Sequence, residues 1–302
     1  MKEKRKGKSF SSWLDNQQHL AYTILVPSIL LLILFAYYPA VQSFSFSFLS
    51  YNIKMPGRIR FNGLTNYLNV LGDPVFLRSI VRVIYFMLAA TCATVVVSFA
   101  VALVLNEKFR GRGILRTIVI LPWAIPPVVN GHLWKWIFNG DFGALNGLLF
   151  QFGIIGTYRH WLNTPFVTLN LAVFMFVWRY TPFIAILFLG VLQSIPGELY
   201  EAAKVDGAGV VARFFYITLP AVRRVGAIAL ILIVIASFTV FDDIYALMEF
   251  DESTKTPMIY NYETTFEMGR FGKGAAMAYM IGIFLFLMTV LYIKMSLREE
   301  KS

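Results

Sequence analysis

The sequence is poor in charged residues, cysteine and histidine. Asp, Glu, Lys and Arg make up 15% of the 302 residues, whereas soluble domains carry about 25%. The single cysteine, Cys92, lies in an apolar run, so a disulfide framework is excluded. The three histidines, His19, His132 and His160, are far apart and lack ligand spacing, so no metal site is expected. No nucleophile–base pair is visible, so the sequence does not indicate an enzyme.

Hydrophobic residues, in contrast, account for 58% of the chain, and the mean hydropathy is +0.64. Such a composition indicates an integral membrane protein with short loops. The formal net charge of +10 would suggest nucleic acid as a partner of a soluble protein. In a chain of this hydropathy the basic residues report topology instead, so no nucleic acid partner is expected.

Six apolar runs are long enough to cross a bilayer. They lie at about 20–43, 79–105, 114–138, 167–193, 225–247 and 274–295. We therefore predict an all-α integral membrane fold with six transmembrane helices, in one domain over residues 20–296. The polar segments 1–19 and 297–302 are predicted to be cytoplasmic tails. The first run is too long for a signal-peptide core and is predicted to be an uncleaved span.

The distribution of Lys and Arg predicts the topology. With the N-terminus inside, the inner segments hold sixteen of these residues and the outer loops hold eight. Basic residues gather on the cytoplasmic side of multi-span proteins. The sequence thus predicts a multi-pass protein of the cell membrane with both termini in the cytoplasm. The loop at about 194–224 then also lies on the cytoplasmic side.

That inner loop contains a short polar helix between two apolar runs. Good helix formers occupy 199–206, and a helix start signal with an early proline precedes them at 194–196. Gly207 can adopt the positive φ that ends a helix. Pro220 predicts a second break before the next apolar run. The helix carries small side chains that let another backbone approach closely, so we expect a partner to grip it.

This pattern resembles the EAA loop of ABC-importer permeases, in which E-A-A-x-x-x-G is followed by I-x-L-P. The matching residues are Glu201, Ala202, Ala203, Gly207, Ile217, Leu219 and Pro220. In that family the loop is the coupling helix, which docks into a cleft of the cytoplasmic ATPase subunit. The resemblance therefore implies ATPase-coupling roles for Glu201, Ala202, Ala203, Asp206 and Gly207.

The resemblance extends over nearly the whole chain from about residue 22, towards the sugar-importer branch of the maltose and glycerol-phosphate type. Tyr38-Pro39, the stretch 63–67, Trp178-Arg179 and the stretch 192–196 carry it. One segment departs from the family pattern. The last external loop often holds a glycine-rich stretch in that branch, and here residues 249–256 contain no glycine.

What the resemblance implies is a type I ABC-importer permease bundle, the membrane subunit of an ATP-driven, binding-protein-dependent importer of a sugar or sugar-like solute. The implied partners are an extracytoplasmic solute-binding protein, a second permease subunit in a heterodimer, a dimeric cytoplasmic ATPase and membrane lipid. ATP and Mg would bind to the ATPase, so no cofactor is expected on this chain.

The substrate pathway is expected near Arg179. An arginine close to the bilayer midplane costs roughly 2.5–3.5 kcal/mol on insertion scales, so it should face the bundle interior. Measured along the spans, the heights of Arg179 and Asp242 differ by about 10–15 Å, so we do not rely on a direct pair between them. Asp243 is expected to be partly exposed to water near the outer end of the fifth span. An equally open alternative is that Arg179 has a structural role and hydrogen-bonds to the backbone carbonyls that Pro182 leaves without a donor. The candidate pathway residues are Trp178, Arg179, Tyr180, Phe238, Phe241 and Asp242, with Trp123 and Asn130 as weaker members.

A secondary transporter or channel driven by an ion gradient is the alternative from another class. Asp242 and Asp243 could serve as its ion-coupling carboxylates. Such carriers usually contain an internal repeat, and none is visible in this sequence. The EAA pattern would also remain unexplained, so the importer permease is the preferred interpretation.

Overall fold

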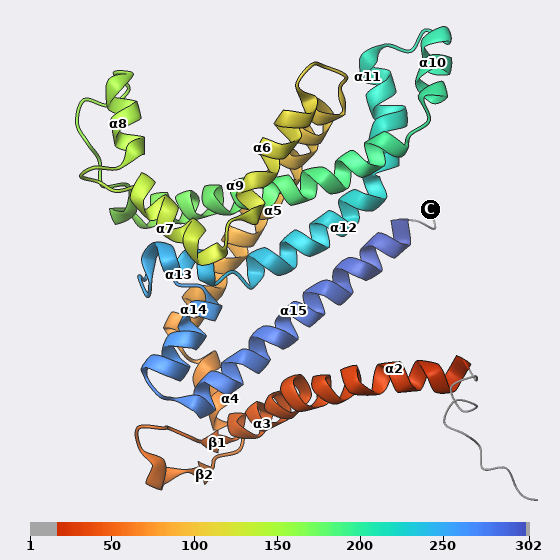
Figure 1. Cartoon of the computed structure of the whole chain (residues 1–302). Helices are drawn as coiled ribbons and strands as arrows, with labels where there is room; N and C mark the ends of the chain where they lie inside the picture. The colour runs from red at the N-terminus through yellow and green to blue at the C-terminus, as the bar shows by residue number, and fades with distance from the viewer. Residues whose placement is uncertain (1–16, 300–302) are drawn as a thin grey trace, which may run out of the picture.

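The computed structural model describes residues 17–299 and is almost entirely helical over that range (Figure 1). The only sheet in the described part is a pair of antiparallel two-residue strands, β1 (Leu49–Ser50) and β2 (Arg60–Phe61). The all-α fold predicted from hydropathy is confirmed. The predicted tails at 1–19 and 297–302 lie largely outside the described residues.

Five helical segments are long and apolar enough to span a bilayer. They are α2 to α3 (Gln17–Ser47), α5 (Pro74–Asn106), α9 (Pro165–Ser194), α11 to α12 (Val210–Phe238) and the first part of α15 (Phe271–Glu299). Shorter helices connect them, namely α4 (Thr65–Leu71), α8 (Ala144–Gln151), α10 (Gly197–Val205), α13 (Asp242–Met248) and α14 (Pro257–Tyr262). Five of the six predicted spans are therefore present as long helices.

The predicted third span, at about 114–138, is not one continuous helix. Instead, α6 (Arg112–Ala124) and α7 (Pro127–Ile137) meet at an angle of 98°. Ile125 and Pro126 between them are extended, because a residue that precedes a proline is pushed out of the helical region and both do so here. The predicted span over 114–138 is therefore interrupted at its prolines, and the pair forms a broken span or a re-entrant loop.

The predicted break at Pro220 is absent, because the helix continues through it. The π-helical turn η4 (Phe214–Thr218) directly precedes Leu219-Pro220, and the Leu219 N–H donates to the Phe214 carbonyl. The wider π turn accommodates the proline ring and its missing N–H. The turn η1 (Ile33–Tyr37) precedes Pro39 in the same way. The fifth span consequently covers 210–238, and the predicted range of 225–247 is wrong at both ends.

The buried core lies mainly between α5, α9 and α12. Phe86 of α5 and Phe176 of α9 pack edge to face with ring centroids 5.5 Å apart, and Ile233 of α12 is equally buried. The Ser98 hydroxyl donates to the Thr181 carbonyl at 3.1 Å. Within a bilayer, such close packing and interhelical hydrogen bonds drive association, since lipid is as apolar as the core. These three helices therefore form the scaffold for the sites described below.

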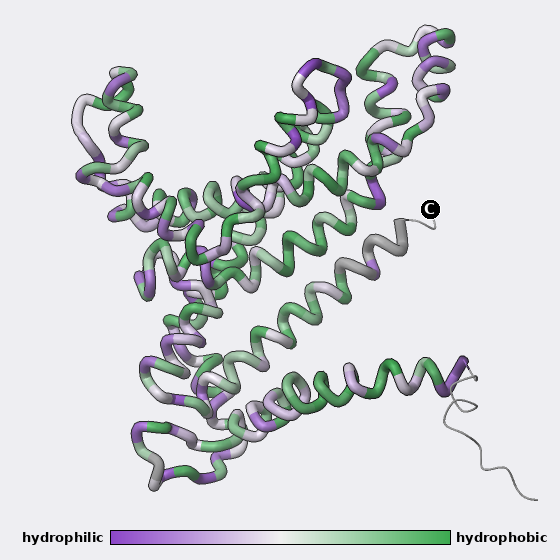
Figure 2. The backbone as a smooth tube through the Cα atoms, in the orientation of Figure 1, coloured by the Kyte–Doolittle hydropathy of each residue, from purple (hydrophilic) through white to green (hydrophobic). Residues whose placement is uncertain are grey.

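The first span lies apart from this scaffold. No residue in its most apolar window is buried, and the hydropathy colours of Figure 2 show that most residues of α2 are hydrophobic. Its contact with the bundle is at α3, where the Tyr279 hydroxyl donates to the Ala40 carbonyl at 2.5 Å and the Tyr279 ring meets Phe44. Most of this span therefore requires cover by lipid or by another chain.

The connecting segments gather at two ends of the molecule. In Figure 1, the α5–α6 turn, α10 and the end of α15 lie toward the right and upper right, and α2 also begins at the right. The strands β1 and β2 and the helices α8, α13 and α14 lie at the left. This alternation is the one that the predicted topology requires, with α10 at the same end as the start of α2 and the end of α15.

At the left-hand end, Asp73 joins three helices. It caps α5 by accepting the Val75 N–H at 2.9 Å, and its other oxygen accepts from Tyr260 of α14 at 2.6 Å and Lys273 of α15 at 2.5 Å. Burial alone raises the pKa of Asp73, but the Lys273 and Tyr260 hydrogen bonds outweigh it and lower that pKa below its ordinary value. The ionised Asp73 carboxylate therefore stabilises the folded state at neutral pH, and this contribution is lost as the pH falls through the folded-state pKa of Asp73.

Candidate functional site

The inner loop forms a short helix, α10, with a complete C-terminal cap. Gly207 adopts φ +80°, the Ala208 N–H donates to the Ala203 carbonyl at 2.8 Å, and the Gly207 N–H donates to the Lys204 carbonyl at 3.0 Å. These bonds make a Schellman motif. The predicted helix end is confirmed. The predicted start signal is not, because Ser194 is the last residue of α9 and its hydroxyl bonds within that helix.

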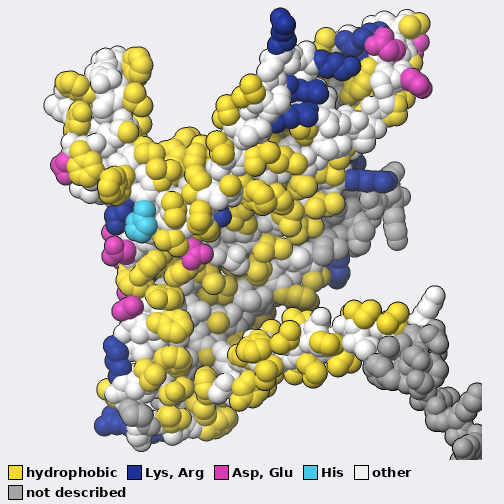
Figure 3. Space-filling view, in the orientation of Figure 1, with side chains coloured by type: hydrophobic (Ala, Val, Ile, Leu, Met, Phe, Trp, Pro, Cys, Tyr) yellow, Lys and Arg dark blue, Asp and Glu magenta, His cyan; other side chains and the backbone are white. Residues whose placement is uncertain are grey.

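The surface of α10 is open to a partner. Glu201, Ala202 and Asp206 are exposed, and Ala203 is half-buried. The Lys204 ammonium lies 2.6 Å from the Glu201 carboxylate and lowers the pKa of Glu201. Figure 3 shows charged side chains of both signs at this upper-right tip. The predicted coupling residues therefore lie together on one projecting element.

The side chain of Tyr200 ties α10 to the span that follows it. The Tyr200 hydroxyl lies 2.9 Å from the Thr218 hydroxyl, within the π turn that leads into α12. Thr218 is buried, whereas most of α10 is exposed. A displacement of α10 by a docked partner would therefore act on the start of α12 through this hydrogen bond.

The second candidate site is a buried ion pair at the meeting point of three helices. Arg179 Nη1 of α9 lies 3.3 Å from Asp243 Oδ2 of α13, and the two side chains are 12% and 6% exposed. Arg179 Nε donates to the Ile125 carbonyl at 3.2 Å, and Asn130 Nδ2 of α7 donates to Asp243 Oδ1 at 2.8 Å. The guanidinium also covers the Tyr180 ring at 5.1 Å. The break between α6 and α7 leaves the Ile125 carbonyl without a helical partner, and Arg179 satisfies it.

Close backbone packing holds α13 against α7 at this point. A Cβ atom at Gly131 of α7 would collide with the Asp243 carbonyl oxygen and with the Ala246 Cβ. Only glycine therefore fits at position 131, and its absence of a side chain allows the approach. The result is that two short helices, neither of which is long enough to span the bilayer alone, are fixed to α9 as one unit.

The structure reverses the expected roles of the two neighbouring aspartates. Asp243 is 4% exposed and pairs with Arg179, although we expected it to be partly wet. Asp242, the candidate pathway residue, is exposed. The reason is that the fifth span ends at Phe238, and α13 then turns Asp243 into the bundle. Arg179 does donate to a backbone carbonyl that lacks a helical partner, as the alternative interpretation expected. The carbonyl belongs to Ile125, however, and not to the turn before Pro182.

The predicted pathway residues do not line one common cavity. Phe238 is 1% exposed and stacks on Phe284 at 5.2 Å, in a separate core cluster. Trp123 stacks on Phe183 at 5.2 Å beside the α6–α7 joint. Asn130 is fully buried in the ion-pair network. The expectation of one polar-aromatic cavity made by all eight side chains is therefore corrected.

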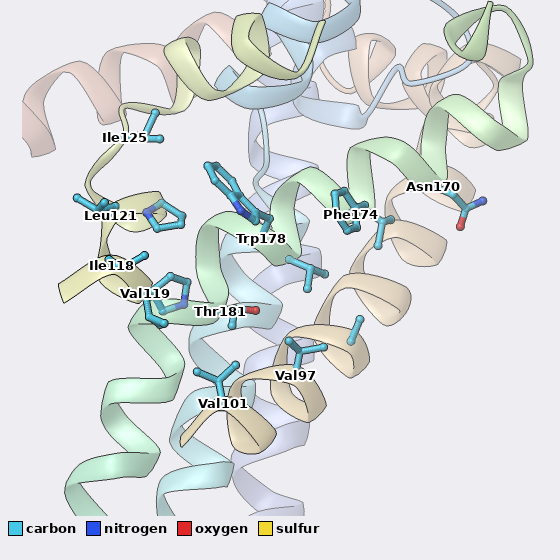
Figure 4. A pocket seen from close by; sticks show the side chains of 15 residues that line it. Val97, Val101, Ile118, Val119, Leu121, Ile125, Asn170, Phe174, Trp178 and Thr181 are labelled. Carbon is cyan, nitrogen blue, oxygen red and sulfur yellow. The ribbon is translucent and has the colours of Figure 1, made fainter. Parts of the chain in front are cut away.

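A cavity of about 790 Å³ does lie between α5, α6 and α9 (Figure 4). Of the predicted pathway residues, Trp178 lines it. Figure 4 shows Trp178 and Phe174 of α9 facing aliphatic side chains of α5 and α6, with Thr181 and Asn170 as polar members. Such an apolar lining suits hydrocarbon better than sugar hydroxyls, which need hydrogen-bond partners when buried.

An aromatic cluster lies at the end of the molecule opposite α10. We define it by Phe241, Tyr245, Phe250, Tyr262 and Phe266. Phe241 stacks on Tyr245 with centroids 5.3 Å apart, and Tyr262 lies 5.1 Å from Phe241 and 5.8 Å from Tyr245. The rings are partly exposed, and Phe266 is 59% exposed. Neither tyrosine hydroxyl forms a hydrogen bond with a residue in the described range, so both are available to a ligand.

Sequence reasoning found only part of this cluster. It identified Phe241 and Asp242 and missed Tyr245, Phe250 and Tyr262. Tyr245 could have been found, because it follows Phe241 by four residues and thus lies on the same helical side. Tyr262 comes from α14, and no local signal predicts that it meets α13.

Comparisons with known proteins agree on the family. A family model described as the binding-protein-dependent transport system inner membrane component matches residues 94–297. The trehalose/maltose transport system permease protein of Thermococcus litoralis is 34% identical over 91% of this chain and 92% of that protein. The sulfoquinovosyl glycerol transport system permease protein of Agrobacterium fabrum is 30% identical over 94% of this chain and 93% of that protein.

Solved structures show the same fold. A bacterial ABC transporter involved in the import of the acidic polysaccharide alginate matches with a TM-score of 0.83 and 23% identity, over 95% of this chain and 98% of that chain. The alginate transporter in complex with a periplasmic protein bound to an alginate pentasaccharide gives a TM-score of 0.82 at 21% identity. Together with the full-length relatives, the family match confirms the predicted recognition. The chain belongs to the inner membrane components of binding-protein-dependent transport systems and is a multi-pass permease subunit of an ABC importer.

Proposed function

We propose that this permease imports a sugar or sugar-like solute and is driven by a separate cytoplasmic ATPase. The observation that carries the coupling part is α10, a capped helix that presents Ala202 and Glu201 at a projecting tip. In this proposal α10 docks on the ATPase, which binds ATP and Mg²⁺. Closure of the ATPase moves α10, and the Tyr200–Thr218 contact passes the movement to α12.

The aromatic cluster supports a sugar as the solute. Aromatic faces pack against the C–H faces of a pyranose ring, and phenol and carboxylate groups hydrogen-bond to its hydroxyls. Phe241 and Asp242 keep their proposed place in the pathway, and Tyr245 and Tyr262 join them. The relative from Thermococcus litoralis, named for trehalose and maltose, supports the same solute class.

The proposed orientation places α10 and both termini in the cytoplasm. The bias of Lys and Arg towards that end supports it. An extracytoplasmic solute-binding protein would then dock at the opposite end, which carries β1, β2, α8, α13 and α14. A complex of this kind is known for the alginate transporter, which shares the fold.

We further propose that a second, different permease subunit covers the first span. The segment Gln17–Ser47 buries none of its most apolar window within this chain. Residues such as Phe35 and Tyr37 are 72% and 65% exposed. A partner helix that packs against this span would make closer van der Waals contacts with it than lipid chains do.

Docking of α10 can be tested by photo-crosslinking. A benzophenone probe attached to a cysteine at Ala203, on a Cys92→Ala background, is expected to form an adduct with the ATPase in the assembled importer. A cysteine at Gly57, which is exposed at the opposite end, serves as the matched control and should give no such adduct. An ATPase adduct from Gly57 and none from Ala203 would contradict the proposal.

A further inference from the structure

The cavity between α5, α6 and α9 is lined almost entirely by apolar side chains. Of its polar members, Asn170 is already hydrogen-bonded, because its amide oxygen accepts from the Tyr85 hydroxyl and its amide nitrogen donates to the Phe166 carbonyl, both at 2.8 Å. A sugar in this cavity would leave most of its hydroxyls without partners. The occupant that fits the lining is therefore a hydrocarbon group.

The cavity can be entered from outside the chain. Val97 of α5 and Ile118 and Leu121 of α6 line it and are 42%, 55% and 58% exposed. All of its lining residues belong to helices of the membrane-spanning bundle. The medium at this depth of a bilayer is lipid hydrocarbon and not water. An acyl chain of a neighbouring lipid can therefore enter the cavity from the side.

The turn between α5 and α6 carries a cluster of basic residues. We call it the basic turn and define it by Lys108, Arg110, Arg112 and Arg116. Residues 106–116 contain one acidic side chain, Glu107. Figure 3 shows Lys and Arg side chains in dark blue on this projecting turn. The excess of positive charge suits an anionic group.

Two members of the basic turn hold the turn together, and two are available to a ligand. Arg116 Nη2 donates to the Leu105 carbonyl at 3.0 Å, and Arg112 Nη1 donates to the Glu107 carbonyl at 3.4 Å. Lys108 and Arg110 are exposed and form no ion pair or hydrogen bond with a residue of the described range. Their charges are therefore free to bind an anion.

The distance between the basic turn and the cavity matches a phospholipid. Arg112 precedes Ile118 at the near edge of the cavity by six residues, or about 9 Å of helix. On α5 the cavity extends from Val101 to Ala93, about 12 Å further towards the bilayer centre. Half of a bilayer with its headgroups measures roughly 20–22 Å. A lipid whose headgroup lies at the basic turn therefore has a chain long enough to fill the cavity along α5.

We propose that the cavity holds an acyl chain of an anionic phospholipid, whose headgroup phosphate is bound by Lys108 and Arg110. The lipid comes from the inner leaflet if the chain has the proposed orientation. Clusters of basic residues beside a membrane-spanning helix are typical binding sites for anionic lipids. A zwitterionic lipid offers the same chain without the net charge and should bind more weakly. The proposal concerns neither the solute nor the ATPase, so it does not depend on the proposed function.

The test is photo-labelling of the assembled importer in phosphatidylcholine nanodiscs. The probes are phosphatidylglycerol and phosphatidylcholine with the same diazirine-tagged acyl chain, each added as a minor component. Mass spectrometry then measures the label on residues 118–125 and 170–182, which line the cavity. The phosphatidylglycerol probe should label them more strongly, by about fivefold for each basic residue that binds the phosphate.

Two double variants test the headgroup contact. Lys108→Gln with Arg110→Gln should lower labelling by the phosphatidylglycerol probe to the level of the phosphatidylcholine probe. Arg58→Gln with Arg60→Gln is the matched control, because these two arginines are exposed at the opposite end of the molecule. The control should keep the wild-type preference. Equal labelling by the two probes in the wild type, or an unchanged preference without Lys108 and Arg110, would overturn the proposal.

A second pair of variants tests the chain contact. Val97→Trp places an indole in the cavity and should remove most of the label from residues 118–125. Val96→Trp is the matched control, because Val96 is the preceding residue of α5, is 62% exposed and does not line the cavity. Its labelling should stay at the wild-type level. Absence of label from the cavity with either probe in the wild type would also overturn the proposal and would indicate that a protein partner covers this face.

Discussion

Replacing Gly207 by valine is expected to abolish solute uptake while the protein still inserts into the membrane. Gly207 adopts φ +80°, which costs an L-residue roughly 1–2 kcal/mol, and a β-branched side chain fits there worst. The two capping bonds to Ala203 and Lys204 would be lost, so α10 would fray at the end that carries the EAA residues. If this free energy is lost from the docked state, the affinity of α10 for the ATPase falls roughly 5- to 30-fold.

Gly209→Val supplies the matched control two residues further on. Gly209 has φ −67° in an extended conformation, and nothing lies within 4 Å of a Cβ placed there. Uptake and co-purification of the ATPase should both remain close to wild type in this variant. If Gly207→Val also retained both, the assignment of α10 as the coupling element would be wrong.

Removing the acidic partner of Arg179 is expected to destabilise the bundle strongly. In Asp243→Asn the guanidinium remains at 12% side-chain exposure without a counter-charge. Breaking a buried pair in this way costs about 3–5 kcal/mol. The midpoint of thermal unfolding in detergent should fall markedly, and uptake should be lost with it. Asp242→Asn should leave the unfolding midpoint unchanged, because the Asp242 carboxylate is exposed and has no partner within the described range.

A double variant separates the charge from the packing. Arg179→Leu with Asp243→Leu removes both charges, and replacing a buried pair by apolar groups is often neutral or stabilising. We expect this variant to recover most of the unfolding midpoint and to leave uptake impaired, because the Ile125 carbonyl and Asn130 then lose their partners. A single Asp243→Asn variant as stable as the wild type would show that the pair has no structural role.

Features set by local chemistry were predictable from the sequence. The end of α10 at Gly207 is an example, because only a residue that tolerates positive φ closes a Schellman motif. The apolar runs likewise predicted the spans, since a bilayer demands about 20 apolar residues per helix. The coupling roles of the α10 residues are implied by the resemblance to the EAA loop and stay a prediction until docking is tested.

Features set by tertiary packing were not predictable. One example is that Asp243, and not Asp242, is buried beside Arg179. This arrangement depends on a turn at 239–241 and on the close approach of α13 to Gly131 of α7, which lies more than 100 residues earlier in the chain. Measuring heights along straight helices placed the acidic partner too far from Arg179. The continuous helix through Pro220 was missed for a related reason, because a single π turn changes the effect of a proline.

The central claim is that this permease uses ATP hydrolysis by a partner to accumulate a sugar. The most direct measurement is uptake of radiolabelled maltose and trehalose into vesicles that contain the complete importer, with α10 and ATP on the inside and the binding protein outside. The account predicts accumulation that requires enclosed ATP and is unaffected by ionophores that dissipate proton and sodium gradients. Accumulation without ATP that the ionophores abolish would contradict it and identify a secondary transporter.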